Sequence, residues 1–556
     1  MIPSLRGKAA LVAAAAVLSF AFACTGGGGS TAAGPSGPAT PIKHLVVIYD
    51  ENISFDHYFA TYPKATNPPG EPSFNAAPNT PSVNGLSGDL LTNNPNARNP
   101  ENEPAATNPF RLDRTQAATA DQTHFYTAEQ RAYNGGKADL FPKYTGHASS
   151  GGTGAFGTKG IVMGYFDGNT VTAMWNYAQH FAMSDNAYGD QYGPSTPGAL
   201  TLISGQTNGL SLAVTPETRV SFMVPDGQGG MTIISDPDPG RDTCSAPAAR
   251  EAAVAMLGRN IGDLLNDAGV SWGWFQGGFD LTVANANGST GCVRSTYSEI
   301  TKFDVRDYVP HHEPFQYYAS TANPTHARPK SMRVVGTQAD KSGNHQYDLR
   351  DFYAAVSSGN FPAVSFLKAP GYQNAHAGNS DPLDEQHFVV DVINFLQQQP
   401  AWRETAVIIA YDDSDGWYDH QMAPVTNASF DSIADQLNGP GLCGVKGQTR
   451  QASGVKTTKP VNGRCGPGAR QPFLVISPWS RVNYVDHTQI IQSSIIRFIE
   501  DNWLGGKRIG GGSFDESAGS IAGLFDFTGQ PHLTPLFLHP DSGTVVRTPP
   551  PRVPGR

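Results

Sequence analysis

Two clusters of acidic and amide side chains each come directly after an apolar run. Asp50-Glu51-Asn52 follows residues 44–49, and Asp412-Asp413-Ser414-Asp415 follows residues 406–410. Carboxylates held together repel one another and raise one another's pKa, and a divalent cation relieves this repulsion. The clusters therefore predict one metal site made of oxygen ligands, which suit Mg, Ca, Mn or Zn. For either cluster alone, the alternative is an ordinary solvated turn. The second cluster lacks the glutamate that closes an EF-hand loop.

A candidate nucleophile, Ser195, lies in the turn YGPSTPG of residues 192–198, which precedes an apolar run. The turn predicts that a helix starts just after it, and backbone N–H groups at a helix N-terminus favour an anion. The alternative is a serine that only caps the helix. The sequence contains no G-x-S-x-G, Walker A or H-E-x-x-H motif, so three common hydrolase sites are not indicated.

Four histidines are candidates for contact with a phosphate group. His311 and His312 are adjacent, His124 follows Asp121 by three residues, and His376 lies in a loop rich in Gly and Asn. Histidine can bind phosphate oxygens or act as a general acid near neutral pH. For each histidine alone, the alternative is a structural or surface role.

The elements that must position these residues alternate along the chain. Apolar runs that predict strands lie at residues 44–49, 270–275, 363–367, 406–410 and 473–476. Apolar residues at helical spacing lie between them, as at Ile261, Leu264 and Leu265. This alternation predicts an α/β fold with a mainly parallel central sheet, helices on both faces and long loop insertions. Ligands bind such sheets at the carboxyl ends of the strands, where both acidic clusters are expected.

The first 24 residues are predicted to be an export signal. Two positive residues, Arg6 and Lys8, precede an apolar stretch too short to span a bilayer, and residues 21–23 form an A-x-A cleavage site. Cys24 follows and completes an imperfect bacterial lipobox. Lipidation of Cys24, which would attach the protein to a membrane, and simple secretion both remain open. Residues 25–41 are only Gly, Ser, Thr, Ala and Pro, which predicts a flexible linker.

Four further cysteines predict two disulfides in an exported chain: Cys244, Cys292, Cys443 and Cys465. Three pairings are possible, and we favour the nearest neighbours, Cys244 with Cys292 and Cys443 with Cys465. The 556 residues carry a net charge of −10, which argues against nucleic acid as a partner. The sequence does not determine the oligomeric state.

Seven motifs occur in one order along the chain. They are KHLVVIYDENISFDHYF (43–59), AYNGGK (132–137), MGY (163–165), GPS (193–195), VPHHEPF (309–315), YDDSDGWYDH (411–420) and PFLVISPWS (472–480). Together they resemble the bacterial phosphoesterase family, which includes acid phosphatases and phosphocholine-directed phospholipases C. The resemblance implies an alkaline-phosphatase-like fold. It covers residues 42–505 as a catalytic domain and leaves residues 506–556 as a C-terminal extension with a Pro-rich end.

The resemblance also implies roles for individual residues. One divalent metal ion would be bound by Glu51, Asn52, Ser195, Asp412 and Asp413. Ser195 would also be the nucleophile, and His311 or His312 would donate a proton to the leaving oxygen. His124 and His376 would line the phosphate pocket with them. By the same resemblance Asp415, Asp419 and His420 are expected to be structural.

The function implied is that of an exported, metal-dependent phosphoric-ester hydrolase. We expect an acid-phosphatase-like enzyme that acts on small phosphate esters through a phosphoserine intermediate. The alternative is a phospholipase C that cleaves phospholipids. That branch typically has Pro-Asn-Arg after the nucleophile, where this chain has Pro197-Gly198-Ala199, and it often has C-terminal β-domains for which residues 506–556 are too few. A sulfatase-like enzyme would need an arginine at position 199, and a non-catalytic surface lipoprotein would not need the acidic clusters.

Overall fold

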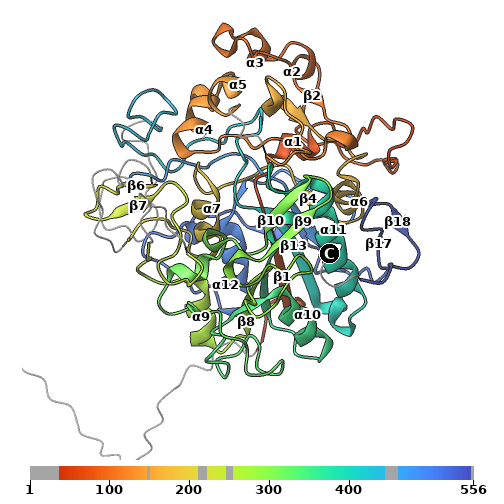
Figure 1. Ribbon diagram of the computed structural model, residues 1–556, viewed down its shortest axis with the longest axis vertical. Coiled ribbons are helices and arrows are strands. Elements are labelled where there is room, and N and C mark those ends of the chain that lie inside the picture. Colours follow the sequence, from red (N-terminus) through yellow and green to blue (C-terminus); the bar gives the residue numbers. More distant parts are fainter. Residues whose placement is uncertain (1–36, 147–150, 211–221, 246–253, 445–460, 553–556) are drawn as a thin grey trace, which may run out of the picture.

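An eight-stranded sheet runs through the middle of the molecule in the order β11-β8-β12-β1-β13-β14-β4-β15 (Figure 1). The computed structural model describes residues 37–146, 151–210, 222–245, 254–444 and 461–552; the predicted export signal, Cys24 and most of the linker lie outside them. The strands are β1 (His44–Asp50), β4 (Ala182–Ser184), β8 (Trp272–Gln276), β11 (Gln346–Asp348), β12 (Val364–Lys368), β13 (Thr405–Tyr411), β14 (Phe473–Ile476) and β15 (Tyr484–Asp486).

The sheet is mainly parallel, as the sequence predicts. Strands β11, β8, β12, β1 and β13 are parallel neighbours, whereas β14 is antiparallel to both β13 and β4. Strand β15 is parallel to β4, so only β14 is reversed. All five strands predicted from the sequence occur within two residues of the expected bounds.

Helices cover both faces of the sheet, which confirms the predicted fold class. On β1, Val46 and Ile48 pack into the core on one face, and Leu45 and Val47 pack into the core on the other. The first core includes residues of α6 (Thr172–His180), α10 (Leu349–Ser357) and α11 (Pro382–Gln397). The second includes residues of α7 (Ser195–Ser204), α9 (Ile261–Ala268) and α12 (Ser493–Trp503). Because both faces are buried, the strands are apolar throughout rather than alternating.

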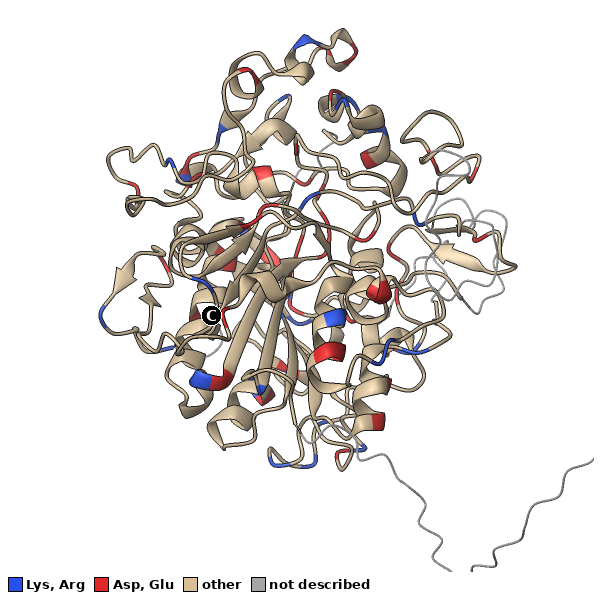
Figure 2. Ribbon diagram, turned by 180° about the vertical axis from the view of Figure 1, so that it is seen from behind, with Lys and Arg blue, Asp and Glu red and all other residues tan. Residues whose placement is uncertain are grey.

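Asp, Glu, Lys and Arg residues occur in the eight strands only as the last residue of a strand. They are Asp50 in β1, Asp348 in β11, Lys368 in β12 and Asp486 in β15. Figure 2 shows the other charges mixed over helices and loops. Since these four strands run in the same direction, their charged ends lie at one edge of the sheet, where α/β proteins bind ligands.

Shorter elements lie mostly in the loop insertions. The helices are α1 (Phe55–Phe59), α2 (Asp89–Thr92), α3 (Pro95–Arg98), α4 (Tyr126–Tyr133) and α5 (Phe141–Tyr144). The strands are β2 (Phe110–Arg111), β3 (Gly164–Tyr165), β5 (Ala187–Tyr188), β6 (Met223–Pro225), β7 (Met231–Ile233), β9 (Ser295–Ser298), β10 (Phe303–Arg306), β16 (Ile490–Ile491), β17 (Phe537–Leu538) and β18 (Val545–Val546). The C-terminal β17–β18 hairpin lies against α11, where the Asn394 side chain donates to the Leu538 carbonyl at 2.8 Å. None of the helices within the described ranges has the length and apolar character needed to cross a membrane.

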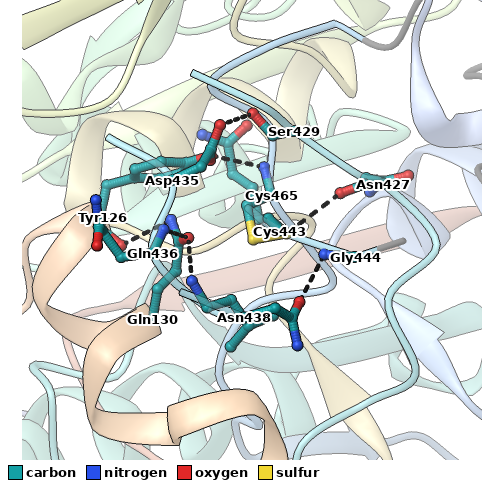
Figure 3. Close-up of a disulfide and its surroundings, with 12 residues drawn as sticks. Tyr126, Gln130, Asn427, Ser429, Asp435, Gln436, Asn438, Cys443, Gly444 and Cys465 are labelled. Atoms are coloured by element: carbon teal, nitrogen blue, oxygen red, sulfur yellow. Dashed lines mark hydrogen bonds between the residues drawn. A yellow bond between two sulfur atoms is a disulfide. The ribbon is translucent and has the colours of Figure 1, made fainter. Parts of the chain in front are cut away.

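Two disulfides form with the nearest-neighbour pairing that we favoured, Cys244–Cys292 and Cys443–Cys465. The second joins two parts of an insertion that contacts α4 (Figure 3). There the Tyr126 hydroxyl donates to Asp435 Oδ1 at 2.7 Å and accepts from the Cys465 backbone N–H at 2.9 Å. The disulfide thus lies close to the turn that carries Ser195, because the Tyr192 N–H donates to the Cys465 carbonyl at 2.9 Å.

Candidate active site

Ser195 is the first residue of α7 and is almost completely buried. Its Oγ lies 3.0 Å from Glu51 Oε2, 3.1 Å from Asp413 Oδ2 and 3.3 Å from Asn52 Oδ1. The residue before the helix is Pro194, and no side chain caps the helix at this position. The alternative of a capping serine is therefore wrong, because the Ser195 hydroxyl faces the acidic clusters instead.

Five side-chain oxygens from the two clusters and α7 converge. Besides its contact with Ser195, the Asn52 side-chain oxygen lies 2.9 Å from Glu51 Oε2, 3.0 Å from Asp412 Oδ1 and 3.2 Å from Asp413 Oδ2. Acceptor oxygens this close repel one another unless a cation or a proton lies among them. Without a cation, the reversed amide of Asn52 would donate to all three carboxylates. Oxygen ligands of one octahedral Mg²⁺ lie about 3 Å apart, so these residues fit a hard divalent cation.

The backbone brings these side chains together. Asn52 has a left-handed conformation with φ 57°, and its N–H donates to Asp412 Oδ1 at 3.1 Å. Helix α7 approaches the second cluster so closely that a Cβ on Gly198 would lie 2.1 Å from the Asp412 carbonyl oxygen. The Tyr49 hydroxyl donates to the Gly198 carbonyl at 2.9 Å and holds the helix there. Glycine at position 198 therefore allows the short distance between Ser195 and the carboxylates.

Lys368, a residue that sequence reasoning missed, places a positive charge beside the acidic clusters. It ends β12, is fully buried, and forms ion pairs with Glu51 Oε1 and Asp412 Oδ2. Burial opposes ionisation, but the Lys368 charge lowers the pKa of Glu51. Lys368 follows the predicted strand of residues 363–367, so the strand-end rule applied to the acidic clusters would have found it.

The pKa values of the other two carboxylates, Asp412 and Asp413, are raised. Burial, and next the charge of Glu51, raise the pKa of Asp412 to about 7 despite Lys368. Burial also raises the pKa of Asp413 well above its usual value, with a contribution from Asp412. This is the repulsion that a divalent cation would relieve.

His311 and His312 each lie beside a carboxylate, but their pKa values shift in opposite directions. His312 Nδ1 is 3.1 Å from Glu51 Oε1, yet burial and the charges of His311 and Lys368 lower the pKa of His312 well below 6.5. His311 Nδ1 is 3.5 Å from Asp238 Oδ1. Burial opposes its charge, but the hydrogen bond with Asp238 and further acidic neighbours raise the pKa of His311. The pKa of His311 is therefore higher than that of His312, so His311 is the member of the pair that holds a proton more readily.

His124 and His376 lie next to each other, with ring centroids 5.7 Å apart. His376 Nε2 is 3.1 Å from the Asn52 amide, and His124 Nδ1 is 3.0 Å from Asp415 Oδ1. Burial opposes protonation, but nearby carboxylates raise the pKa of both histidines, that of His124 well above 6.5. Asp415 thus contacts a predicted pocket residue, and its side chain orients the ring of His124.

Asp419 and His420 contact a buried arginine and a further carboxylate. The buried Arg470 donates to Asp419 Oδ2 at 3.1 Å and to Asp56 Oδ1 at 3.0 Å. His420 Nδ1 lies 2.6 Å from Asp56 Oδ2. This four-residue ion-pair network fixes α1 against the loop that follows β13.

The Phosphoesterase family matches residues 42–504, which include all seven motifs. The chain belongs to the Phosphoesterase family. It is therefore a phosphoric-ester hydrolase, as the resemblance implied.

Relatives in this family include proteins named as phospholipases C. Phospholipase C B of Mycobacterium tuberculosis is 24% identical over 93% of this chain and 84% of the relative. Non-hemolytic phospholipase C of Pseudomonas aeruginosa is 24% identical over 83% of this chain, which spans only 54% of that relative. Among solved structures, murine ectonucleotide pyrophosphatase/phosphodiesterase 5 matches 64% of this chain and 95% of its own, with 11% identity and a TM-score of 0.28.

Proposed function

We propose that the chain is an exported hydrolase of phosphoric monoesters in which Ser195 is the nucleophile. The observation that carries the proposal is the position of Ser195 Oγ, 3.0–3.3 Å from Glu51, Asn52 and Asp413 at the start of α7. A buried hydroxyl among three acidic or amide oxygens serves no packing purpose, whereas an activated nucleophile needs such neighbours.

One divalent cation would be held by Glu51, Asn52, Ser195, Asp412 and Asp413. When bound, it would favour loss of the Ser195 proton and would offset negative charge on phosphoryl oxygens. The close approach of the five oxygens and the raised pKa of Asp412 support this assignment. Oxygen ligands alone do not select among Mg, Ca, Mn and Zn.

In the proposed reaction the Ser195 proton passes to a carboxylate that faces it, Glu51 or Asp413, and Ser195 Oγ forms a bond to phosphorus while the bond to the leaving oxygen breaks. His311 gives its proton to that oxygen, because its pKa is the higher of the adjacent pair, and it regains a proton from the water that later attacks phosphorus. The positive charges of His124 and His376 offset the charge of the phosphoryl oxygens. Water then hydrolyses the phosphoserine, which restores Ser195 and releases phosphate.

Export is supported by the two disulfides, which persist in oxidising compartments. Residues 1–24 would direct export and Cys24 would carry a lipid anchor, so the mature protein would remain at the cell envelope. Its substrates would then be phosphate esters outside the cytoplasm.

Phospholipase C activity is the second candidate, and the names of relatives that align with 93% of the chain favour it. The substrate would be a phospholipid, and the products would be a diacylglycerol and a phosphorylated head group. The reacting groups would be the same, because both reactions displace an oxygen from phosphorus.

The deciding experiment compares hydrolysis of p-nitrophenyl phosphate and of phosphatidylcholine vesicles by residues 25–556, with and without chelator. Faster monoester hydrolysis supports the phosphatase, and faster diester hydrolysis supports the phospholipase C. The Ser195→Ala variant should fold but lose turnover of either substrate. Full activity of that variant would refute Ser195 as the nucleophile, and inactivity of the wild type on both substrates after resupply of metal would favour a binding protein.

A further inference from the structure

Glu129 on α4 joins the two loops that supply Ser195 and Asp413. Its side chain is buried. Its Oε2 accepts from the Gly193 backbone N–H at 2.9 Å, and its Oε1 accepts from Ser414 Oγ at 2.5 Å. Gly193 precedes Ser195 by two residues, and Ser414 follows Asp413. One carboxylate therefore spans the backbone segments that carry the nucleophile and a carboxylate facing it.

Each segment also has other contacts, among them the Tyr192 N–H with the Cys465 carbonyl at 2.9 Å and the Ile53 N–H with the Asp413 carbonyl at 3.0 Å. Gly193 has φ 118°, a conformation that favours glycine, so the turn before Ser195 depends on outside contacts to keep its shape. On the other side, Ser414 Oγ also accepts from the Gly416 N–H at 3.1 Å, and Asp413 Oδ1 accepts from the Asp415 N–H at 2.7 Å. A shift of Ser414 would therefore move Asp413 with it.

Helix α4 is itself a fixed support. Gln130, the next residue, accepts from the backbone N–H groups of Gln436 and Leu437 at 2.9 and 3.2 Å. Tyr126 is held by Asp435 and Cys465 beside the disulfide (Figure 3). The position of Glu129 is thus defined by contacts that do not involve the reacting groups.

We propose that Glu129 is a positioning residue that sets the separation between Ser195 Oγ and Asp413 Oδ2, 3.1 Å in this structure. A carboxylate is needed because it accepts from a backbone N–H and a hydroxyl at once. Alanine loses both contacts, whereas glutamine keeps the acceptor for the Gly193 N–H but can meet Ser414 only if the hydroxyl accepts instead of donating. The inference rests on the proposed function, since the separation matters only if Ser195 attacks phosphorus.

The test measures kcat and KM of Glu129→Ala, Glu129→Gln and Ser414→Ala with a phosphate ester that the wild type hydrolyses. A misplacement of reacting groups by 1 Å costs about 100-fold in rate, so Glu129→Ala should lose about 100-fold in kcat. Its KM should change less than about threefold, because the histidines remain in place. Glu129→Gln and Ser414→Ala should each show a smaller loss than Glu129→Ala.

Arg131→Ala is the matched control, because Arg131 lies on the same helix, is exposed and contacts neither segment of the site. It should keep kcat within about threefold of the wild type. An equal loss in Arg131→Ala, or wild-type kcat in Glu129→Ala, would overturn the inference. If Glu129→Ala does not fold, Ser414→Ala tests the inference instead, because it removes only one hydroxyl. Unchanged kcat in Ser414→Ala would also overturn the inference. An inactive wild type would instead refute the proposed function.

Discussion

Lys368 Nζ lies 3.3 Å from Asp412 Oδ2, and neither side chain is accessible to solvent. The same ammonium pairs with Glu51. Together with one divalent cation it would balance the charges of Glu51, Asp412 and Asp413. Lys368 and one proposed cation would thus offset these three carboxylate charges.

Replacing Lys368 by Met should destabilise the protein and reduce its activity. Removing one partner of a buried ion pair leaves an uncompensated charge and costs about 3–5 kcal/mol. The free energy of unfolding, measured by urea denaturation in chelator, should fall by this amount, and kcat should fall with it. Lys43→Met is the control, because Lys43 pairs with Glu404 at the surface. Equal stability of the two variants would contradict this role.

The sequence predicts the central strands because they are buried on both faces and therefore continuously apolar, as in residues 406–410. The short strands β4, β11 and β15, which lie at or next to the two edges of the sheet, have three residues each and no such pattern, so the sequence does not predict them. The acidic clusters were found because each follows a predicted strand directly.

Contacts between distant segments account for what the sequence did not reveal. Glu129 meets Gly193 and Ser414 across separations of 64 and 285 residues, and nothing in its own helix marks it. Asp238 likewise meets His311 from a loop without a motif. Lys368 is different, because the strand-end rule applied equally to lysine would have predicted it.

Divalent metal should stabilise the protein through the five converging oxygens. A ligand at 100 times its Kd stabilises the folded state by about 2.7 kcal/mol. After treatment with chelator, Tm should rise when Mg, Ca, Mn or Zn is added. The rise should be lost in Asp413→Asn and kept in His311→Gln, which removes no proposed ligand. An equal rise in Asp413→Asn, or no rise with any of the four ions, would contradict the site.

Activity should fall with rising pH as His311 loses its proton. Because acidic neighbours raise the pKa of His311 above 6.5, the midpoint of the loss should lie above that pH. Asp238→Asn removes one of these charges, so the midpoint should move to lower pH by about one unit. The measurement is kcat against pH for the wild type and Asp238→Asn. In a His311→Gln background the same substitution should cause no shift; a shift there would mean that Asp238 acts through another group.

Gly198→Ala should lower both stability and activity, although this change usually stabilises a helix by about 1 kcal/mol. The added Cβ would lie 2.1 Å from the Asp412 carbonyl oxygen, so α7 must move away and carry Ser195 with it. We expect a loss of about 1–3 kcal/mol in the free energy of unfolding from overpacking and of about 100-fold in kcat from misplacement. Gly157→Ala is the control, because its Cβ would meet only the Ala120 Cβ, at 3.7 Å. A Gly198→Ala variant more stable than the wild type and equally active would show that α7 does not need this close approach to Asp412.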